Sequence, residues 1–181
     1  AENVVFVTKN GLIKKTKLQE YAETKKTTGI QAIKIKDGDA LINVTLMGNN
    51  EELLMVTKQG MVVRVPTDDI KAIGRLTSGV KGLSLKENDE VINVIPIVDK
   101  TKDLVITTNA GKGKRLELSS FIVQNRGGLG VSCIKLDQGD WVSGAALTSS
   151  CICRSSMDLP CAFAKLSKFC LRVCHVHCAI P

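Results

Sequence analysis

Short apolar and polar runs recur along the chain with a period of about 50 residues, which indicates a repeat protein. Residues 5–16 contain a β-rich apolar run, a polar turn that ends in glycine, and a second run that ends in basic residues. The same pattern returns at residues 54–65 and 104–115, with the turn glycines 49 and 51 residues apart. Because glycine adopts positive φ without steric cost, this position favours hairpin closure. The pattern predicts one β-hairpin in each of three repeats.

A second block follows each hairpin, at residues 29–35, 79–85 and 130–136. The second half of each block alternates apolar and polar residues, which is typical of a half-buried strand. An acidic turn and a further apolar run follow, with Asp39, Asp89 and Asp140 at equivalent places. Four short strands in about 50 residues match the size of a propeller blade. We therefore expect an all-β fold, an open arc of three four-stranded blades.

The repeats divide the chain into residues 1–50, 51–100 and 101–150, and residues 151–181 lie outside the pattern. Aromatic residues make up only 3% of the 181 residues, so the expected core is aliphatic. No run of 18 or more uncharged apolar residues occurs, and we expect no contact with a membrane. The first residues resemble neither a Met start nor a signal peptide, so we expect the chain to be part of a longer protein.

Basic residues are concentrated in three windows, although the net charge of +7 is modest. The windows 8–34, 57–81 and 111–135 hold 17 of the 21 Lys and Arg residues in positions 1–150, but only five of the 17 acidic residues. If equivalent positions lie on one rim, these windows form the positive band that a polyanion backbone requires. The alternative is that they are solvated strand ends, and the charge pattern alone leaves both interpretations open.

Residues 1–150 contain no histidine, which excludes a His-based catalytic relay there. The Gly-rich loops lack the Gly-Lys-Ser/Thr ending of a nucleotide-binding P-loop. We therefore expect no catalytic residue and no cofactor in this chain.

Residues 151–181 hold six of the seven cysteines and both histidines. Zinc would require a tetrahedral ligand set, but the segment lacks paired Cys-x-x-Cys motifs. A disulfide framework is inconsistent with a body that has one cysteine and no secretion signal. The remaining interpretation, an unstructured or out-of-frame tail without a metal site, is favoured.

The loop Gln124-Asn125-Arg126-Gly127-Gly128-Leu129-Gly130 resembles the box Gln-[Lys/Arg]-Arg-Gly-Gly-[Lys/Arg]-Gly, which is found in the C-terminal domain of the DNA gyrase A subunit. The Val-Thr-Lys-Asn-Gly and Gly-Lys-Arg segments, and residues 74–82 around Arg75 and Lys81, are also similar to that domain. The resemblance covers residues 4–148. Asn125 and Leu129 stand where the box usually carries cations.

The resemblance implies a β-pinwheel, a ring of about six four-stranded blades whose basic rim wraps double-stranded DNA. It further implies a role in DNA gyrase, an ATP-hydrolysing type II topoisomerase (an isomerase) that introduces negative supercoils in the bacterial cytoplasm, at the chromosome. ATP and Mg²⁺ would be used elsewhere in that enzyme. The B subunit of gyrase and a second A subunit would be contacted through an N-terminal region outside this chain. The box follows two blades without one, so it corresponds to a later copy.

Two alternatives remain at the level of the sequence. The A subunit of topoisomerase IV has a related pinwheel with a poorly formed box, and the retained Arg126-Gly127-Gly128 favours gyrase. A protein-interaction propeller is disfavoured because the WD40 signature is absent. The residues expected to bind DNA are Lys14, Lys15, Arg64, Arg75, Lys81, Lys112, Lys114, Arg115, Gln124, Asn125, Arg126, Gly127, Gly128 and Gly130.

Overall fold

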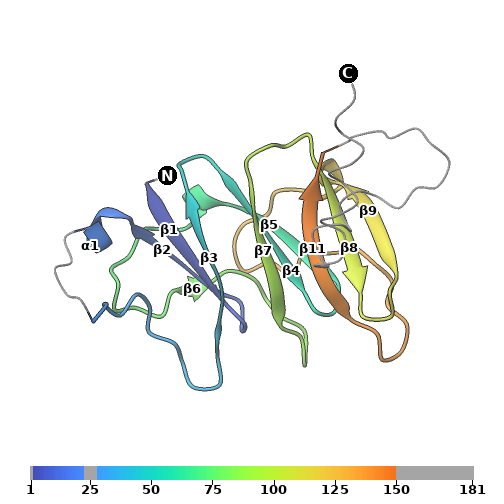
Figure 1. Cartoon of the computed structure of the whole chain (residues 1–181), viewed down its shortest axis with the longest axis horizontal. Helices are drawn as coiled ribbons and strands as arrows, with labels where there is room; N and C mark the ends of the chain where they lie inside the picture. Colours follow the sequence, from blue (N-terminus) through green and yellow to red (C-terminus); the bar gives the residue numbers. More distant parts are fainter. Residues whose placement is uncertain (1, 23–27, 150–181) are drawn as a thin grey trace, which may run out of the picture.

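Three antiparallel β-sheets follow one another along the molecule in the order of the sequence (Figure 1). The computed structural model describes residues 2–22 and 28–149. The all-β prediction is confirmed, and the only described α-helix, α1 (Gln19–Ala22), is a single short turn. No described helix is both long and apolar enough to span a bilayer.

The first sheet has the strand order β3-β1-β2-β6. Its strands are β1 (Asn3–Thr8), β2 (Leu12–Lys17), β3 (Leu41–Met47) and β6 (Val80–Lys81). The second sheet has the order β10-β5-β4-β7. Its strands are β4 (Glu52–Thr57), β5 (Met61–Pro66), β7 (Val91–Ile97) and β10 (Val131–Ser132). Both therefore have the expected four strands.

The third sheet has three strands among the described residues, in the order β11-β8-β9. They are β8 (Asp103–Thr108), β9 (Gly113–Glu117) and β11 (Val142–Thr148). Two 3₁₀ turns, η1 (Thr67–Asp69) and η2 (Leu118–Ser120), follow β5 and β9. The three predicted hairpins are β1–β2, β4–β5 and β8–β9, with left-handed glycines at Gly11, Gly60 and Gly111.

The fourth strand of a sheet comes from the next repeat, which the sequence did not predict. β6 pairs with β2, with Val80 opposite Ile13, and β10 pairs with β5, with Val131 opposite Val62. Only two residues form strand in each of the later blocks, 79–85 and 130–136, and the first block, residues 29–35, forms none. The reason is that the block crosses to the edge of the preceding sheet, and the described part of the chain contains no sheet before the first. Each repeat is thus tied to the one before it.

Two glycines allow this crossing. Gly79 and Gly130 have φ of +87° and +80°, in the left-handed region. A Cβ atom would lie 2.6 Å from the carbonyl oxygen of Ile13 at Gly79, and 2.5 Å from that of Val62 at Gly130. Both the backbone conformation and the close approach therefore require glycine.

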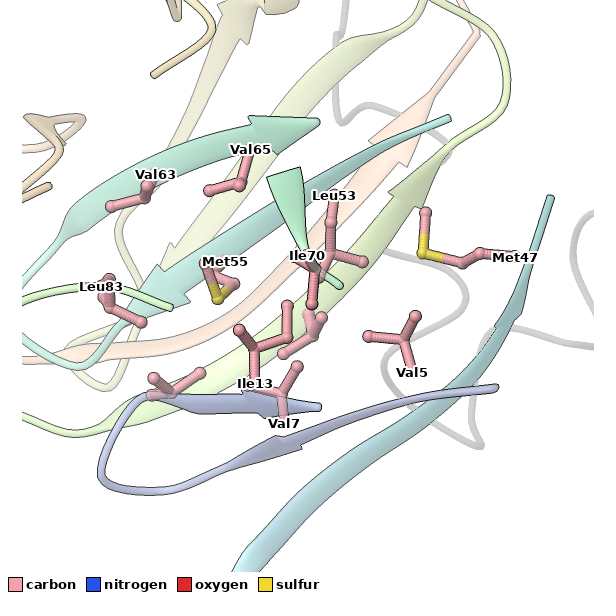
Figure 2. Close-up of a cluster of buried hydrophobic side chains, with 12 residues drawn as sticks. Val5, Val7, Ile13, Met47, Leu53, Met55, Val63, Val65, Ile70 and Leu83 are labelled. Atoms are coloured by element: carbon pink, nitrogen blue, oxygen red, sulfur yellow. The ribbon is translucent and has the colours of Figure 1, made fainter. Parts of the chain in front are cut away.

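Aliphatic side chains fill the space between neighbouring sheets, as the composition predicted. Between the first and second sheets, Val7 and Ile13 face Met55 and Ile70 (Figure 2). A second cluster, which includes Leu54 and residues of β8 and β11, joins the second and third sheets. The molecule is held together by these layers and by the exchanged strands.

The acidic turns close the hairpin ends. A carboxylate oxygen of Asp39, Asp89 and Asp140 accepts a hydrogen bond from the backbone N–H of the turn residue Asn10, Gln59 and Ala110, at 2.9, 2.9 and 3.0 Å respectively. Each aspartate therefore joins the start of the third strand to the turn of its own hairpin.

Candidate nucleic-acid interface

Two lysines of β2 that were expected to bind DNA are buried between repeats. The Lys14 side chain is fully buried, and its Nζ donates to the carbonyl oxygens of Ala32, at 2.7 Å, and Arg75. Burial lowers the pKa of Lys14 below its ordinary value. Lys15 Nζ donates to the carbonyl oxygen of Thr67 at 2.7 Å. Both ammonium groups are held by backbone carbonyl oxygens inside the protein, so they do not face a ligand.

Arg64 has the same structural role in the second sheet. Its Nε lies 2.6 Å from Glu52 Oε2, and its side chain is only 10% exposed. Its guanidinium also donates to the carbonyl oxygens of Leu118 and Phe121. Lys15 and Arg64 occupy equivalent positions, and each holds a carbonyl of the turn that follows the hairpin of the next repeat, at Thr67 and at Leu118. The signal in the sequence was their fixed place in the second strand of each hairpin.

The three cations of the third hairpin are exposed but have partners. Lys112 forms an ion pair with Asp137, which raises the pKa of Lys112. Lys114 Nζ donates to the carbonyl oxygen of Cys133 at 3.0 Å. Arg115 stands at the position of Arg64 and pairs with Asp103. Exposure here follows from the missing strand beside β9 in the described structure, so the charge of these residues is only partly available to a ligand.

The Gly-rich loop 124–130 packs on residues 82–84 of the second repeat. Gly127 N–H donates to the carbonyl oxygen of Gly82 at 2.6 Å, and its own oxygen accepts from the Ser84 hydroxyl. The Gly128 oxygen accepts from Ser84 N–H at 2.9 Å. These contacts give Gly127 and Gly128, which were expected to bind DNA, a structural role.

The other residues of this loop divide into two groups. Gln124 N–H donates to the carbonyl oxygen of Arg64, and Gly130 is the crossing glycine described above. The side chains of Asn125 and Arg126 are exposed. Arg126 is therefore the residue of the loop that can present a charge to a ligand.

The loops that cross between sheets form one continuous surface. We call residues 29–34, 74–84 and 124–132 the rim loops. The first and second are joined by the hydrogen bond from Lys34 N–H to the Thr77 oxygen, and the second and third by the Ser84 contacts. The predicted alignment of equivalent basic segments is thus present in the described part of the chain.

The rim loops carry four cations and no acidic residue. Lys34, Lys81 and Arg126 are exposed, and Arg75 is half-buried. None of these four rim cations forms an ion pair with a described residue, whereas cations elsewhere, such as Lys58 and Lys100, do. The residues expected from the sequence to bind DNA did not include Lys34. Its position in the repeat is equivalent to that of Ser84.

Among the described residues, no group of three or more His, Cys, Asp or Glu side chains could hold a metal ion. The one cysteine in this part, Cys133, is buried, which raises its pKa to about 11. The predictions made for residues 151–181 lie outside the described residues.

Comparisons with known proteins agree with this repeat structure. The sequence model of the family described as "DNA gyrase C-terminal domain, beta-propeller" matches residues 2–46, 51–97 and 102–149, one segment for each repeat. The DNA gyrase A subunit of Helicobacter pylori (strain J99) is 36% identical over 137 residues, 75% of this chain and 16% of the relative. The DNA gyrase A subunit of Chlamydia trachomatis is 36% identical over 153 residues, 83% of this chain and 18% of the relative.

Solved structures share the fold. The C-terminal domain of DNA topoisomerase IV has a TM-score of 0.77 at 28% identity, over 81% of this chain and 46% of that one. The C-terminal domain of E. coli ParC has a TM-score of 0.68 at 20% identity, over 82% of this chain and 62% of that one. The chain spans less than a fifth of the two gyrase proteins. On the match of all three repeats, the chain belongs to the DNA gyrase C-terminal domain family of β-propellers.

Proposed function

We propose that this chain binds double-stranded DNA through its rim loops, as part of the A subunit of DNA gyrase. The observation that carries the proposal is the set of four rim cations, which lie on adjoining loops without acidic neighbours in the same loops. The phosphate backbone of DNA attracts such a surface whatever the base sequence. The predicted alternative of solvated strand ends does not explain why the paired cations lie off these loops.

Recognition of DNA by this surface depends little on base sequence. Specific readout requires an element that enters a groove, most often a helix or a two-stranded ribbon. The described helix α1 has four residues, and backbone hydrogen bonds hold the second and third rim loops at the sheet edges. Phosphate contacts therefore dominate, and the affinity falls steeply with salt.

The arrangement of the rim loops supports wrapping. Two of them lie at the edges of the first and second sheets, and all three adjoin one another, so a duplex that contacts all of them follows this surface from sheet to sheet. In the proposed gyrase, this path orients DNA for ATP-driven negative supercoiling, while ATP and Mg²⁺ are handled by other parts of the enzyme. The expected partners, in the bacterial cytoplasm, are the B subunit of gyrase and a second A subunit.

The A subunit of topoisomerase IV is the second candidate. It is favoured by the likeness to the C-terminal domain of that enzyme and by the two missing cations at Asn125 and Leu129. The retained Arg126-Gly127-Gly128 favours gyrase. A complete enzyme that carries this domain separates the two, because gyrase introduces negative supercoils into relaxed circles, whereas topoisomerase IV leaves them relaxed.

Alanine substitution tests the DNA-binding surface. Lys81→Ala and Arg126→Ala should each weaken duplex binding by about tenfold, since a charge-assisted hydrogen bond contributes about 1.5 kcal/mol. Lys102→Ala removes the same charge from a site off the rim loops and serves as the control. Fluorescence anisotropy with a labelled duplex measures all three. Equal effects of the three substitutions would overturn the assignment of the surface.

A further inference from the structure

The rim loops are joined to one another in two different ways. Between the second and third rim loops, Gly127 N–H donates directly to the carbonyl oxygen of Gly82 at 2.6 Å. Gly127 has a left-handed backbone, with φ of +88°. The equivalent residues at the first junction are Leu76 and Ala32. Leu76 carries a Cβ and is not left-handed, and its N–H does not bond to Ala32. The direct backbone link is therefore absent from the first junction.

The ammonium group of Lys14 takes the place of that link. Its Nζ donates to the carbonyl oxygen of Ala32 in the first rim loop, at 2.7 Å, and to that of Arg75 in the second. The Tyr21 hydroxyl donates to the same Ala32 oxygen at 3.3 Å, and the centroid of the Phe6 ring lies 5.7 Å from the ammonium. Lys14 thus joins the two rim loops from inside the protein.

The two junctions differ by a matched pair of residues. In the second repeat, the position of Lys14 is occupied by Val63, which is fully buried in the core and has no donor in its side chain. At that junction the Gly127 N–H supplies the donor. Where Leu76 stands in place of Gly127, the hairpin carries Lys14 in place of Val63. The lysine therefore accompanies the loop that cannot form the direct backbone bond.

Half of the Lys14 contact recurs in the third repeat. Lys114, at the position of Lys14, donates to the carbonyl oxygen of Cys133 at 3.0 Å, and Cys133 is equivalent to Ala32. The rim loop that contains Cys133 pairs with the preceding sheet through β10. The bond from this lysine to its own loop thus forms where a preceding sheet is present as well, so it does not depend on the position of the repeat in the chain.

The segment that carries Arg75 is anchored at both ends on β2. Ile73 N–H donates to a β2 carbonyl oxygen at 2.8 Å, and Val80 pairs with β2 as part of β6. Between these anchors, residues 74–79 form no strand. The hydrogen bond from Lys14 reaches the Arg75 oxygen inside this interval. It therefore fixes the backbone at the residue whose guanidinium belongs to the rim cations.

We propose that Lys14 is a positioning residue for DNA binding, whose ammonium places Arg75 on the rim surface together with Lys34 and Lys81. This role rests on the proposed function of the rim loops. The Lys14 side chain is fully buried, so its effect on binding passes through the loops that it joins. Without the ammonium, the Arg75 carbonyl loses its donor and the interval between the anchors gains freedom. The guanidinium must then be ordered when DNA binds, which lowers the affinity.

Substitutions of two neighbouring buried lysines separate positioning from stability. Lys14→Met removes the ammonium that joins the rim loops. Lys15→Met is the matched control, because Lys15 is also buried and its Nζ donates to the oxygen of Thr67, which lies off the rim loops. Each variant loses one charge and leaves a carbonyl oxygen without its ammonium donor, so each should lower the stability of the fold.

A milder variant guards against loss of the fold. Lys14→Gln keeps a neutral donor on a shorter side chain and should show the same pattern as Lys14→Met with a smaller amplitude. All variants are made in the 181-residue chain. Circular dichroism at the assay temperature checks that each one is folded.

Fluorescence anisotropy with a labelled duplex, over a series of salt concentrations, measures the effect on binding. Arg75→Ala should weaken binding by about tenfold and Lys14→Met by about fivefold. Arg75→Ala should also flatten the salt slope by about 0.9, and Lys14→Met should shift the slope toward that value. Lys15→Met should change neither the affinity nor the slope. The double variant Lys14→Met, Arg75→Ala should bind no more weakly than Arg75→Ala alone, because both act through one contact.

Three results would overturn the role of Lys14. They are equal effects of Lys14→Met and Lys15→Met on binding, additive losses in the double variant, and an unchanged affinity after Arg75→Ala. The last result would leave the proposed function to the variants Lys81→Ala and Arg126→Ala, which test the rim loops without Lys14.

Discussion

Replacement of the crossing glycine Gly130 by alanine tests how the repeats are joined. Gly130 and Gly139 have nearly the same left-handed backbone, with φ of +80° and +79°. A Cβ at Gly139 meets no atom within 4 Å, whereas at Gly130 it lies 2.5 Å from the Val62 oxygen. Gly139→Ala therefore measures the backbone cost alone, and Gly130→Ala adds the cost of the close approach.

The structure sets the size of the difference. Alanine in the left-handed region costs about 1 kcal/mol at either site. At Gly130 the added Cβ also forces the backbone away from β5. The strand that pairs with β5 at this point, β10, has only two residues, Val131 and Ser132. Loss of two backbone hydrogen bonds, among them the one from Cys133 to Gly60, adds about 2 kcal/mol. We expect Gly130→Ala to lower the free energy of unfolding by about 3 kcal/mol.

Urea denaturation of the two variants and the unchanged chain measures these values. The midpoint should fall much further for Gly130→Ala than for Gly139→Ala, and the slope m should stay similar. Hydrogen exchange should speed up at the Cys133 amide in Gly130→Ala only. Equal losses of stability in the two variants would refute the reasoning, since they would show that the crossing strand adds nothing to the fold.

Three further predictions follow from the site geometry. Arg64→Met should lower the free energy of unfolding by about 3 kcal/mol, because it leaves Glu52 poorly paired in a buried site. Arg115→Met, at the exposed equivalent position, should lower it by under about 1 kcal/mol in the same denaturation assay. Hydrogen bonds from Lys9 and Lys58 lower the pKa of Glu90 from its ordinary value of 4.5. They therefore stabilise the fold above that pH, and this contribution is lost as the pH falls through the lowered pKa. In acid titrations followed by thermal melting, the stability of Glu90→Gln should decline less than that of the unchanged chain. Bound to a relaxed closed circle, the three-repeat chain should change the writhe less than a complete domain does, and an equal change on a topoisomer gel would contradict the proposed wrapping.

The periodic features of the fold could be predicted from the sequence. Turn glycines and apolar runs located the hairpins, because closure and burial are local requirements of the chain. The aspartates at equivalent places marked the turns that hold each hairpin end. The partner of the second block could not be predicted in this way, because alternation indicates a strand but not the sheet that the strand joins. Val80 thus pairs with Ile13 of the preceding repeat.

The roles of the cations were harder to predict for the same reason. Lys14 and Arg126 both lie in basic windows, yet the Lys14 side chain is buried and the Arg126 side chain is exposed. What separates them is a carbonyl from the following repeat, which meets Lys14 and is far away in sequence. The glycines of the box loop were expected to bind DNA, but the Gly127 N–H donates to the Gly82 carbonyl oxygen of the preceding repeat.

The salt dependence of duplex binding tests the central claim most directly. For DNA-binding proteins, the logarithm of the affinity falls with the logarithm of salt by about 0.9 for each neutralised phosphate. The triple variant Lys34→Ala, Lys81→Ala, Arg126→Ala should therefore flatten the slope by nearly three if each residue contacts a phosphate. The control is a triple alanine variant of three described lysines off the rim loops that form no ion pair with a described residue, namely Lys36, Lys86 and Lys102. The account predicts a flatter slope for the rim variant and an almost unchanged slope for the control, whereas the same slope in both variants would contradict it.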